Sequence, residues 1–316
     1  MEPWTSFWER GHSTTFGAFF KDGYDGAIKS WWKQILQQTT PPTDILDIGC
    51  GNAALLIELL QLQISGTYTG VDLAGVRLNE VAKQKLKQST GLSALLKPHT
   101  NAEELPLESE SIDLAASVFG IEYSDLQKSL PEAIRVLRPN GVFHALVHAD
   151  ESVISTMSAR ALSEFQDADM SAIVTSLRAI DQQLNELRLP ARLKQSQSAE
   201  AARIQLNGLA QKYMSNLNPD TGNAIMVQFV GDALKYFKML TQSDTIRSQY
   251  IDGIEAEFQA SRQRYRAMAG AAQSETDIAE IKRLLQQQHC TTVMVEKFFA
   301  DEDQKELGGW HISVRK

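Results

Sequence analysis

The stretch that decides the fold is DILDIGCGNAALLIELL, residues 44–60. Ile45 to Ile48 is a short apolar strand signal that contains one acid, Asp47, and Gly49-Cys50-Gly51 follows it as a turn. Ala53 to Leu60 is rich in apolar residues and predicts a buried helix. Glycines let a ligand approach the backbone, and the first turn of a helix offers unpaired N–H groups with a partial positive charge. The order strand, glycine turn, helix therefore predicts a small-molecule site with a carboxylate in the same crevice.

Two kinds of cofactor site use such a turn. Gly49-x-Gly51-x-x-Ala54 fits the dinucleotide pattern G-x-G-x-x-G/A, and an acid, Asp72, follows about twenty residues later, as NAD sites require. Asp47 argues against a dinucleotide, because its charge would lie beside a pyrophosphate. Asp47-x-Gly49-x-Gly51 resembles motif I of the class I S-adenosylmethionine (SAM)-dependent methyltransferases, whose sulfonium cofactor carries no phosphate. The resemblance implies SAM as the cofactor, and an NAD-dependent oxidoreductase is the alternative.

The order of elements after this turn also resembles the methyltransferase family. Strand signals alternate with helical stretches and lie at Tyr68–Val71, Leu92–Lys97, Ser111–Ser117 and Val142–Val147. Residues 132–143, EAIRVLRPNGVF, resemble the family's L-R-P-G-G turn, with Asn140 in place of the first glycine. Strand signals at 291–299 and 308–314 resemble the hairpin that closes these sheets. We expect a Rossmann-like α/β fold whose seven-stranded, mostly parallel sheet is closed by a C-terminal antiparallel hairpin.

The chain is longer than one such domain, and a helical insertion accounts for the excess. Residues 152 to about 288 are rich in helix-forming residues and show apolar positions at three- and four-residue intervals. They contain fifteen Lys+Arg and fifteen Asp+Glu, so they form no basic platform. The expected domains are an N-terminal aromatic helical lid (1–40), a SAM-binding core (41–151), a helical insertion or cap (152–274), and a C-terminal helix with the hairpin that completes the core (275–316).

Composition disfavours several classes of protein. The net charge of −8 argues against a surface that grips nucleic acid phosphates. Two cysteines, Cys50 and Cys290, are too few for a disulfide framework and suit a reducing compartment. The chain shows no signal-peptide pattern and no run of roughly eighteen apolar residues. We expect a cytoplasmic protein that has no membrane span, no metal site and a small-molecule substrate. We expect the insertion either to cap the site or to form the interface of a homodimer.

The resemblance assigns more residues to the cofactor. Asp72, at the end of the second strand, is expected to accept hydrogen bonds from the ribose hydroxyls, with helix capping as the structural alternative. Residues 101–106, NAEELP, resemble the family stretch D-A-E-x-L-P that meets the adenine. The resemblance implies that the end of the fourth strand faces the transferable methyl group. The full expected set is Tyr24, Asp47, Gly49, Cys50, Gly51, Asp72, Leu73, Asn101, Ala102, Glu103, Ser117, Val118 and Phe119.

The chemistry requires few catalytic side chains. Transfer of a methyl group from a sulfonium depends mainly on alignment of the acceptor and exclusion of water. A general base helps where the acceptor is a hydroxyl or a protonated amine. The candidates are His148, Glu122 and Tyr123, with His148 best placed and a merely structural histidine as the alternative. We expect methylation of a small molecule at O or N, and a catalytically silent SAM-binding or assembly protein is a further alternative.

The first 32 residues contain nine of the chain's 24 aromatic residues. Such rings either anchor the segment to the core or face a ligand. We expect the segment to close over the cofactor, with Phe19, Phe20 or Tyr24 against the ligand or substrate.

Overall fold

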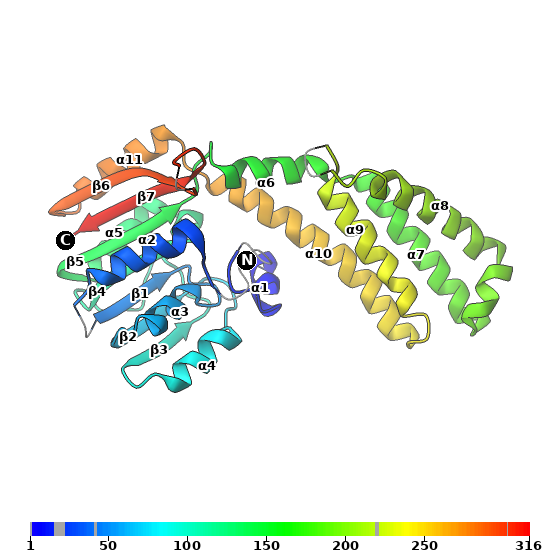
Figure 1. Cartoon of the computed structure of the whole chain (residues 1–316), viewed down its shortest axis with the longest axis horizontal. Coiled ribbons are helices and arrows are strands. Elements are labelled where there is room, and N and C mark those ends of the chain that lie inside the picture. Colours follow the sequence, from blue (N-terminus) through cyan, green and yellow to red (C-terminus); the bar gives the residue numbers. More distant parts are fainter. Residues whose placement is uncertain (1, 16–22, 41–42, 219–220, 302) are drawn as a thin grey trace. The chain divides into compact units, whose positions relative to one another are not determined.

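The computed structural model describes residues 2–15, 23–40, 43–218, 221–301 and 303–316. The chain forms two compact units (Figure 1). The first consists of Met1–Met157 and Ala267–Lys316, and the second of Ser158–Arg266. The sequence led us to expect an insertion at 152–274, so the second unit falls inside that range.

The first unit is built on one seven-stranded sheet with the strand order β3-β2-β1-β4-β5-β7-β6. β1 to β5 run parallel, and β7 pairs antiparallel with both β5 and β6. The strands are β1 Thr43–Ile48, β2 Gly66–Val71, β3 Leu92–Lys97, β4 Ile112–Val118, β5 Leu137–Val147, β6 Thr292–Phe299 and β7 Leu307–Arg315. This confirms the expected Rossmann-like α/β sheet with its C-terminal antiparallel hairpin.

Helices cover both faces of this sheet. One core joins the sheet to α5 and α11, and another joins the opposite face to α2, α3 and α4. The helices of this unit are α1 Glu2–Glu9, α2 Gly26–Gln37, α3 Ala54–Gln61, α4 Glu80–Gln88, α5 Leu126–Arg135 and α11 Glu275–Gln286. Trp31 and Trp32 of α2 are buried in the second core, so this part of the N-terminal aromatic segment serves packing.

The family-like turn at Arg138–Gly141 takes a form that the sequence did not predict. β5 begins at Leu137 and includes these residues, while its register with β4 shifts between Ile112 and Leu114. Asn140 adopts the expected left-handed conformation, with φ 69°. Two steps along β4, from Ile112 to Leu114, correspond to five along β5, from Leu137 to Val142, so β5 accommodates three extra residues as an irregularity without leaving the sheet.

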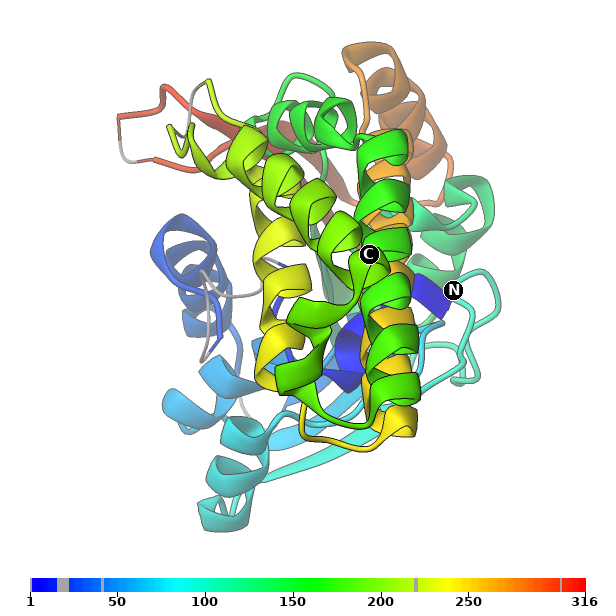
Figure 2. The ribbon, with the colours of Figure 1, turned by 90° about the vertical axis from the view of Figure 1, so that its right-hand side faces the viewer.

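The second unit is helical. It contains α7 Asp167–Leu187, α8 Gln197–Met214 and α9 Ala224–Lys235, while α6 Val153–Glu164 and α10 Asp244–Ala271 cross its boundaries. α7, α8 and α9 lie side by side (Figure 2). Their apolar faces enclose a separate core that includes Met226, Phe229 and Tyr236. Within it, the Asp181 carboxylate accepts hydrogen bonds from the Tyr236 hydroxyl (2.7 Å) and from Arg247 Nε (2.6 Å).

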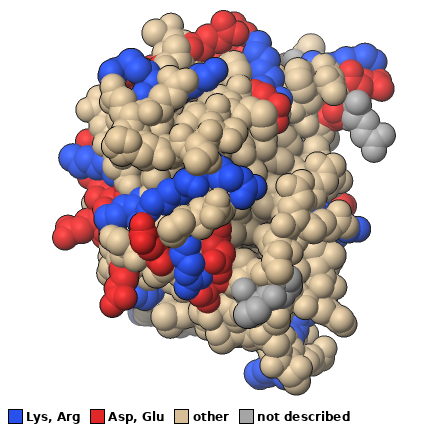
Figure 3. Space-filling view, turned by 90° about the vertical axis from the view of Figure 1, so that its left-hand side faces the viewer, with Lys and Arg blue, Asp and Glu red and all other residues tan. Residues whose placement is uncertain are grey.

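The surface carries mixed charge. Figure 3 shows Lys and Arg side chains interspersed with Asp and Glu on one face of the first unit. In the first unit, Arg138 forms ion pairs with Asp44 (2.8 Å) and Asp113 (2.7 Å). No helix in the described part of the chain is long and apolar enough to span a membrane.

Replacing one glycine in each unit by alanine should change the free energy of unfolding in opposite directions. Gly49 has φ +70°, and a Cβ there would lie 2.7 Å from the Cα of Gly120, so Gly49→Ala should destabilise the first unit by about 1–3 kcal/mol. Gly208 lies within α8, where a Cβ would meet no described atom within 4 Å, so Gly208→Ala should stabilise the second unit by about 0.5–1 kcal/mol. Urea unfolding followed by circular dichroism measures both changes. A fully stable Gly49→Ala variant would refute the constraint.

Candidate functional site

The turn at Gly49-Cys50-Gly51, here called the glycine turn, is fixed at the carboxyl ends of three strands. The N–H groups of Gly49 and Cys50 both donate to the carbonyl of Val71, the last residue of β2. The buried Ser117 hydroxyl, on β4, donates to the carbonyl of Ile48 at 2.7 Å. The turn therefore lies where the strand order reverses, which is where open α/β sheets bind ligands.

The backbone of the loop after β4 packs directly against the backbone of the glycine turn. A Cβ on Gly49 would lie 2.7 Å from the Gly120 Cα, and a Cβ on Gly120 would lie 2.9 Å from the Gly49 Cα. Phe119, which directly precedes Gly120, has φ +53°. Only glycine at both positions permits this approach, and the contact brings the residues after β4 next to the turn.

Asp47 supplies a buried carboxylate beside the turn. It accepts a hydrogen bond from the Tyr68 hydroxyl at 2.6 Å, and burial raises its pKa to about 7. Cys50, next to it, is also buried, and burial raises the pKa of its thiol, so the thiol stays protonated. Buried Tyr24 has its pKa raised by burial and by the charge of Asp47. A cation in the crevice would stabilise the ionised form of Asp47.

Asp72 supplies a second carboxylate just beyond β2. Its two oxygens accept the N–H groups of Gly51 and Ala74, each at 2.8 Å, and burial raises its pKa. A carboxylate has about four lone-pair sites, so two remain for ligand hydroxyls. The cap of α4 is Asn79, so Asp72 does not have the alternative role of helix cap. The neighbouring Leu73 is partly exposed.

The loop between β3 and β4 carries the residues expected at the adenine. Asn101 is exposed, and its Oδ1 accepts the Glu103 N–H at 3.0 Å. Ala102 is half-buried. Glu103 accepts the Asp125 N–H at 3.1 Å and pairs with Lys128 at 3.5 Å, so its side chain holds the loop.

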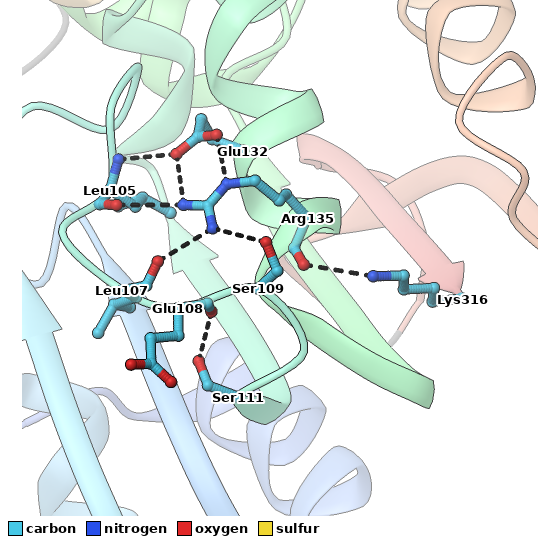
Figure 4. Close-up of polar contacts among 8 residues, drawn as sticks. All are labelled: Leu105, Leu107, Glu108, Ser109, Ser111, Glu132, Arg135 and Lys316. Atoms are coloured by element: carbon cyan, nitrogen blue, oxygen red, sulfur yellow. Dashed lines mark hydrogen bonds and ion pairs between the residues drawn. The ribbon is translucent and has the colours of Figure 1, made fainter.

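A clamp that sequence reasoning missed fixes the far part of this loop. Glu132 and Arg135 of α5 form a two-point ion pair with distances of 2.6 and 2.8 Å (Figure 4). Arg135 also donates to the carbonyls of Leu105 (3.1 Å) and Leu107 (3.0 Å), while Glu132 accepts the Leu105 N–H (2.9 Å). The signal in the sequence was an acid and a base three positions apart on a helix, which alone predicts only a surface pair.

The three candidate catalytic residues lie together at the ends of β4 and β5. The Tyr123 hydroxyl lies 3.0 Å from His148 Nε2, and Glu122 Oε1 accepts the His148 backbone N–H at 2.9 Å. Glu122 Oε1 is also 3.9 Å from His148 Nε2. Phe119 stacks on the imidazole with ring centroids 4.5 Å apart. The sequence alone did not show that Glu122 and Tyr123 contact His148.

Burial sets the protonation states of this cluster. It lowers the pKa of His148 to about 4 and raises that of Glu122 to about 8. At neutral pH the imidazole is therefore uncharged and the carboxyl is largely protonated. Within the described residues, the buried His148 Nδ1 has no hydrogen-bond partner. A neutral imidazole donates from one ring nitrogen and accepts at the other, so His148 can receive a proton at neutral pH. Its lowered pKa makes it a weak base unless a nearby negative charge stabilises the imidazolium.

A segment distant in the sequence fixes the end of β5. The Gln273 N–H donates to the His148 carbonyl at 2.7 Å, and Ala149 forms an isolated parallel bridge with Gln273. Trp310 Nε1 in turn donates to the Gln273 carbonyl at 3.1 Å. The sequence contains no pattern that marks Gln273, because its contacts are made through the backbone.

Helix α1 lies over this edge of the sheet. Trp8 packs so closely on Gly51 that a Cβ there would be 2.6 Å from the indole. The Gly75 N–H donates to Thr5 Oγ1 at 2.9 Å, and the Trp4 ring meets Tyr123 edge-on, with centroids 5.6 Å apart. Two of the aromatic residues predicted to face the ligand, Phe19 and Phe20, lie outside the described residues.

The carboxylate acceptors fit a sulfonium cofactor that bears hydroxyls and carries no phosphate. Two acids, Asp47 and Asp72, flank a turn whose glycines leave the backbone bare. In the described part of the chain, no group of three or more His, Cys, Asp or Glu side chains is placed to hold a metal ion.

The comparison with known families agrees with this geometry. Residues 46–145 match the family model described as a methyltransferase domain. The chain carries a class I SAM-dependent methyltransferase domain. Its cofactor is SAM, and the glycine turn, Asp72 and the loop after β4 lie within the matched region of this methyltransferase domain.

Relatives of the methyltransferase domain differ in their named substrates. The chain is 32% identical over 125 residues to a demethylmenaquinone methyltransferase from Desulfitobacterium hafniense, covering 38% of this chain and 49% of that protein. It is 30% identical over 150 residues to a malonyl-[acyl-carrier protein] O-methyltransferase from Dechloromonas aromatica, covering 44% and 53%. The chain thus spans about half the length of the curated relatives it matches. A solved SAM-dependent methyltransferase from Methanosarcina mazei is 14% identical, with a TM-score of 0.38 and coverage of 90% and 96%.

The raised pKa of Glu122 makes stability depend on pH. Folded Glu122 retains its proton up to about pH 8, whereas an unfolded glutamate loses it near 4.5, so the folded state binds more protons in this window. The free energy of unfolding contributed by Glu122 therefore falls as pH rises from about 4.5 to 8. In Glu122→Gln, the melting temperature should fall less over that range than in the wild type. Parallel pH profiles of the two proteins in calorimetric melting would contradict the assignment.

Proposed function

We propose that the protein binds SAM across the glycine turn and transfers its methyl group to a small molecule at oxygen or nitrogen. The observation that supports this most is the position of a neutral, buried His148 at the same sheet edge as Asp47 and Asp72. Parallel strands place their carboxyl ends at one edge, so the cofactor acids and the candidate base face one crevice.

In this proposal the two acids bind the cofactor from opposite ends. Asp72 accepts the ribose hydroxyls, since its carboxylate is already oriented by the N–H groups of Gly51 and Ala74. Asp47 faces the cationic part, which lowers the free energy of its buried ionised form. The exposed Asn101 and the half-buried Ala102 line the adenine side, on a loop held by Glu132 and Arg135. Leu73, partly exposed beside Asp72, packs on the adenine.

The remaining expected residues shape the crevice. Ser117, Val118 and Phe119 are buried, and the Ser117 hydroxyl is engaged with backbone groups. We propose that these three residues do not contact the cofactor through polar side-chain atoms. Instead, they fix the position of the loop after β4. Glu103 holds the adenine loop by its pair with Lys128. The buried Tyr24 lies close enough to Asp47 for that charge to raise its pKa, so we place it at the border of the cofactor site.

Bound SAM supplies a methyl group that is already activated. The chain's own residues then accept the proton that the acceptor loses. Tyr123 Oη takes this proton while its own passes to His148 Nε2, 3.0 Å away. Glu122, 3.9 Å from Nε2, stabilises the resulting imidazolium when it is ionised. Phe119, stacked on the imidazole, excludes water from the same place.

A carbon acceptor is the second candidate. Some relatives are named C-methyltransferases, among them a ubiquinone/menaquinone biosynthesis enzyme from Bartonella tribocorum that is 31% identical over 128 residues. A carbon next to an ionisable hydroxyl also requires a base, so the cluster at His148 serves either acceptor. The position of the transferred methyl group in the product distinguishes the two.

Cofactor binding is tested by isothermal calorimetry with S-adenosylhomocysteine. Asp72→Asn should weaken binding by about 1–3 kcal/mol, because a charge-assisted acceptor of the ribose hydroxyls is lost. The matched control is Asp113→Asn, which removes a half-exposed acid of β4 that pairs with Arg138. The control should bind like the wild type, and NADH should give no heat with any of the three. Unchanged affinity in Asp72→Asn would sink the ribose assignment.

Turnover is tested with SAM that carries a deuterated methyl group, incubated with a metabolite extract. Wild-type protein should produce at least one labelled small molecule by mass spectrometry. His148→Gln and Tyr123→Phe should each lower its rate of formation on the order of 100-fold, the contribution of a general base. His289→Gln, at an exposed histidine after α11, is the control. A SAM-binding protein without turnover would give no labelled species in any sample.

A further inference from the structure

Asn52 connects the glycine turn to the N-terminal segment. It is fully buried and directly follows Gly51. Its Nδ2 donates to the carbonyl of Trp8 at 2.9 Å and to the carbonyl of His12 at 2.8 Å. Its Oδ1 accepts the Arg77 N–H at 3.1 Å. One side chain therefore joins three separate parts of the chain at the edge of the cofactor crevice.

The backbone of Asn52 adds a further connection. Its carbonyl accepts the side-chain amide of Asn79 at 3.1 Å, and Asn79 Oδ1 caps α4 through the Ala82 N–H at 2.7 Å. Asparagine is suited to position 52 because it supplies two donors and an acceptor on one short side chain. Aspartate has no donor when ionised and would place its charge against two carbonyl oxygens.

The segment that Asn52 holds is the one that covers the crevice. Residues 2–15, here called the cover segment, include Trp8, which lies on Gly51, and Thr5, which accepts the Gly75 N–H. The cover segment also reaches the candidate base, because Trp4 meets Tyr123 edge-on. The glycine turn and the cover segment are therefore joined by the hydrogen bonds of Asn52 and by the contact of Trp8 with Gly51.

We propose that Asn52 is a positioning residue that couples cofactor binding at the glycine turn to docking of the cover segment. This inference rests on the proposed SAM site. A ligand that stabilises the turn in its observed conformation favours the docked segment, and the docked segment favours the ligand by the same factor. The docked segment keeps Trp4 against Tyr123, so a bound cofactor strengthens a contact that reaches the candidate base.

The test uses hydrogen exchange of the full-length chain with and without saturating S-adenosylhomocysteine. In the wild type, the ligand should slow exchange of the amides of residues 2–15 on the order of tenfold. In Asn52→Asp this protection should disappear, and calorimetric affinity for S-adenosylhomocysteine should fall by a similar factor. Asn223→Asp is the matched control, because Asn223 caps α9 and its Nδ2 donates to the Glu164 carbonyl in the second unit. The control should keep both wild-type values.

A second variant keeps the test decisive if Asn52→Asp does not fold. Thr5→Val removes the acceptor of the Gly75 N–H from the cover segment itself, and it should reduce protection and affinity in the same direction by a smaller factor. Wild-type ligand affinity together with full ligand-induced protection in the folded variants would overturn the role of Asn52. Absence of S-adenosylhomocysteine binding by the wild type would instead refute the proposed function.

Discussion

The contact between the backbones of Gly49 and Gly120 is the constraint on which the site depends. A side chain at either position would force the loop after β1 away from the loop after β4. Because the two loops touch, Asp47 and Asp72, at the ends of β1 and β2, lie at the same sheet edge as the cluster of Glu122, Tyr123 and His148 after β4 and β5, as the proposed site requires. The Ser117 hydroxyl strengthens this contact, because it donates to the Ile48 carbonyl and accepts the Ile121 N–H. The hydrophobic cores on both faces of the sheet fix the strands, and the glycine contact sets the distance between their ends.

Burial then gives each ionisable group near this contact its chemical character. Asp47 and Glu122 have raised pKa values because the surrounding core excludes water, while the pKa of His148 is lowered for the same reason. The sheet edge therefore holds an uncharged imidazole 3.9 Å from the Glu122 carboxyl, and a buried Asp47 whose ionised form a nearby cation would stabilise. This combination is suited to a cationic cofactor and an acceptor that loses a proton. The buried rings of Trp8, packed on Gly51, and Phe119, stacked on His148, exclude water from these two places.

Much of the fold was predictable, because its signals are local. The strand, glycine turn and helix at 44–60 and the hairpin near the C-terminus are each encoded in consecutive residues. The irregularity that keeps Arg138–Gly141 within β5 was not predictable, because it depends on register with a neighbouring strand. The roles of Asn52, Gln273 and the Glu132–Arg135 clamp were also invisible, since they arise from contacts between distant segments. The candidate catalytic residues were chosen by their position after strands, but only the structure gives the 3.0 Å distance from Tyr123 to His148.

The most direct measurement is a crystal structure of the full chain with S-adenosylhomocysteine bound. The account predicts that the ribose hydroxyls contact Asp72, that the sulfur lies beside the glycine turn, and that its open side faces Tyr123 and His148. A ligand bound elsewhere, or one whose sulfur faces away from the Tyr123–His148 pair, would contradict the claim that one crevice holds both cofactor and base.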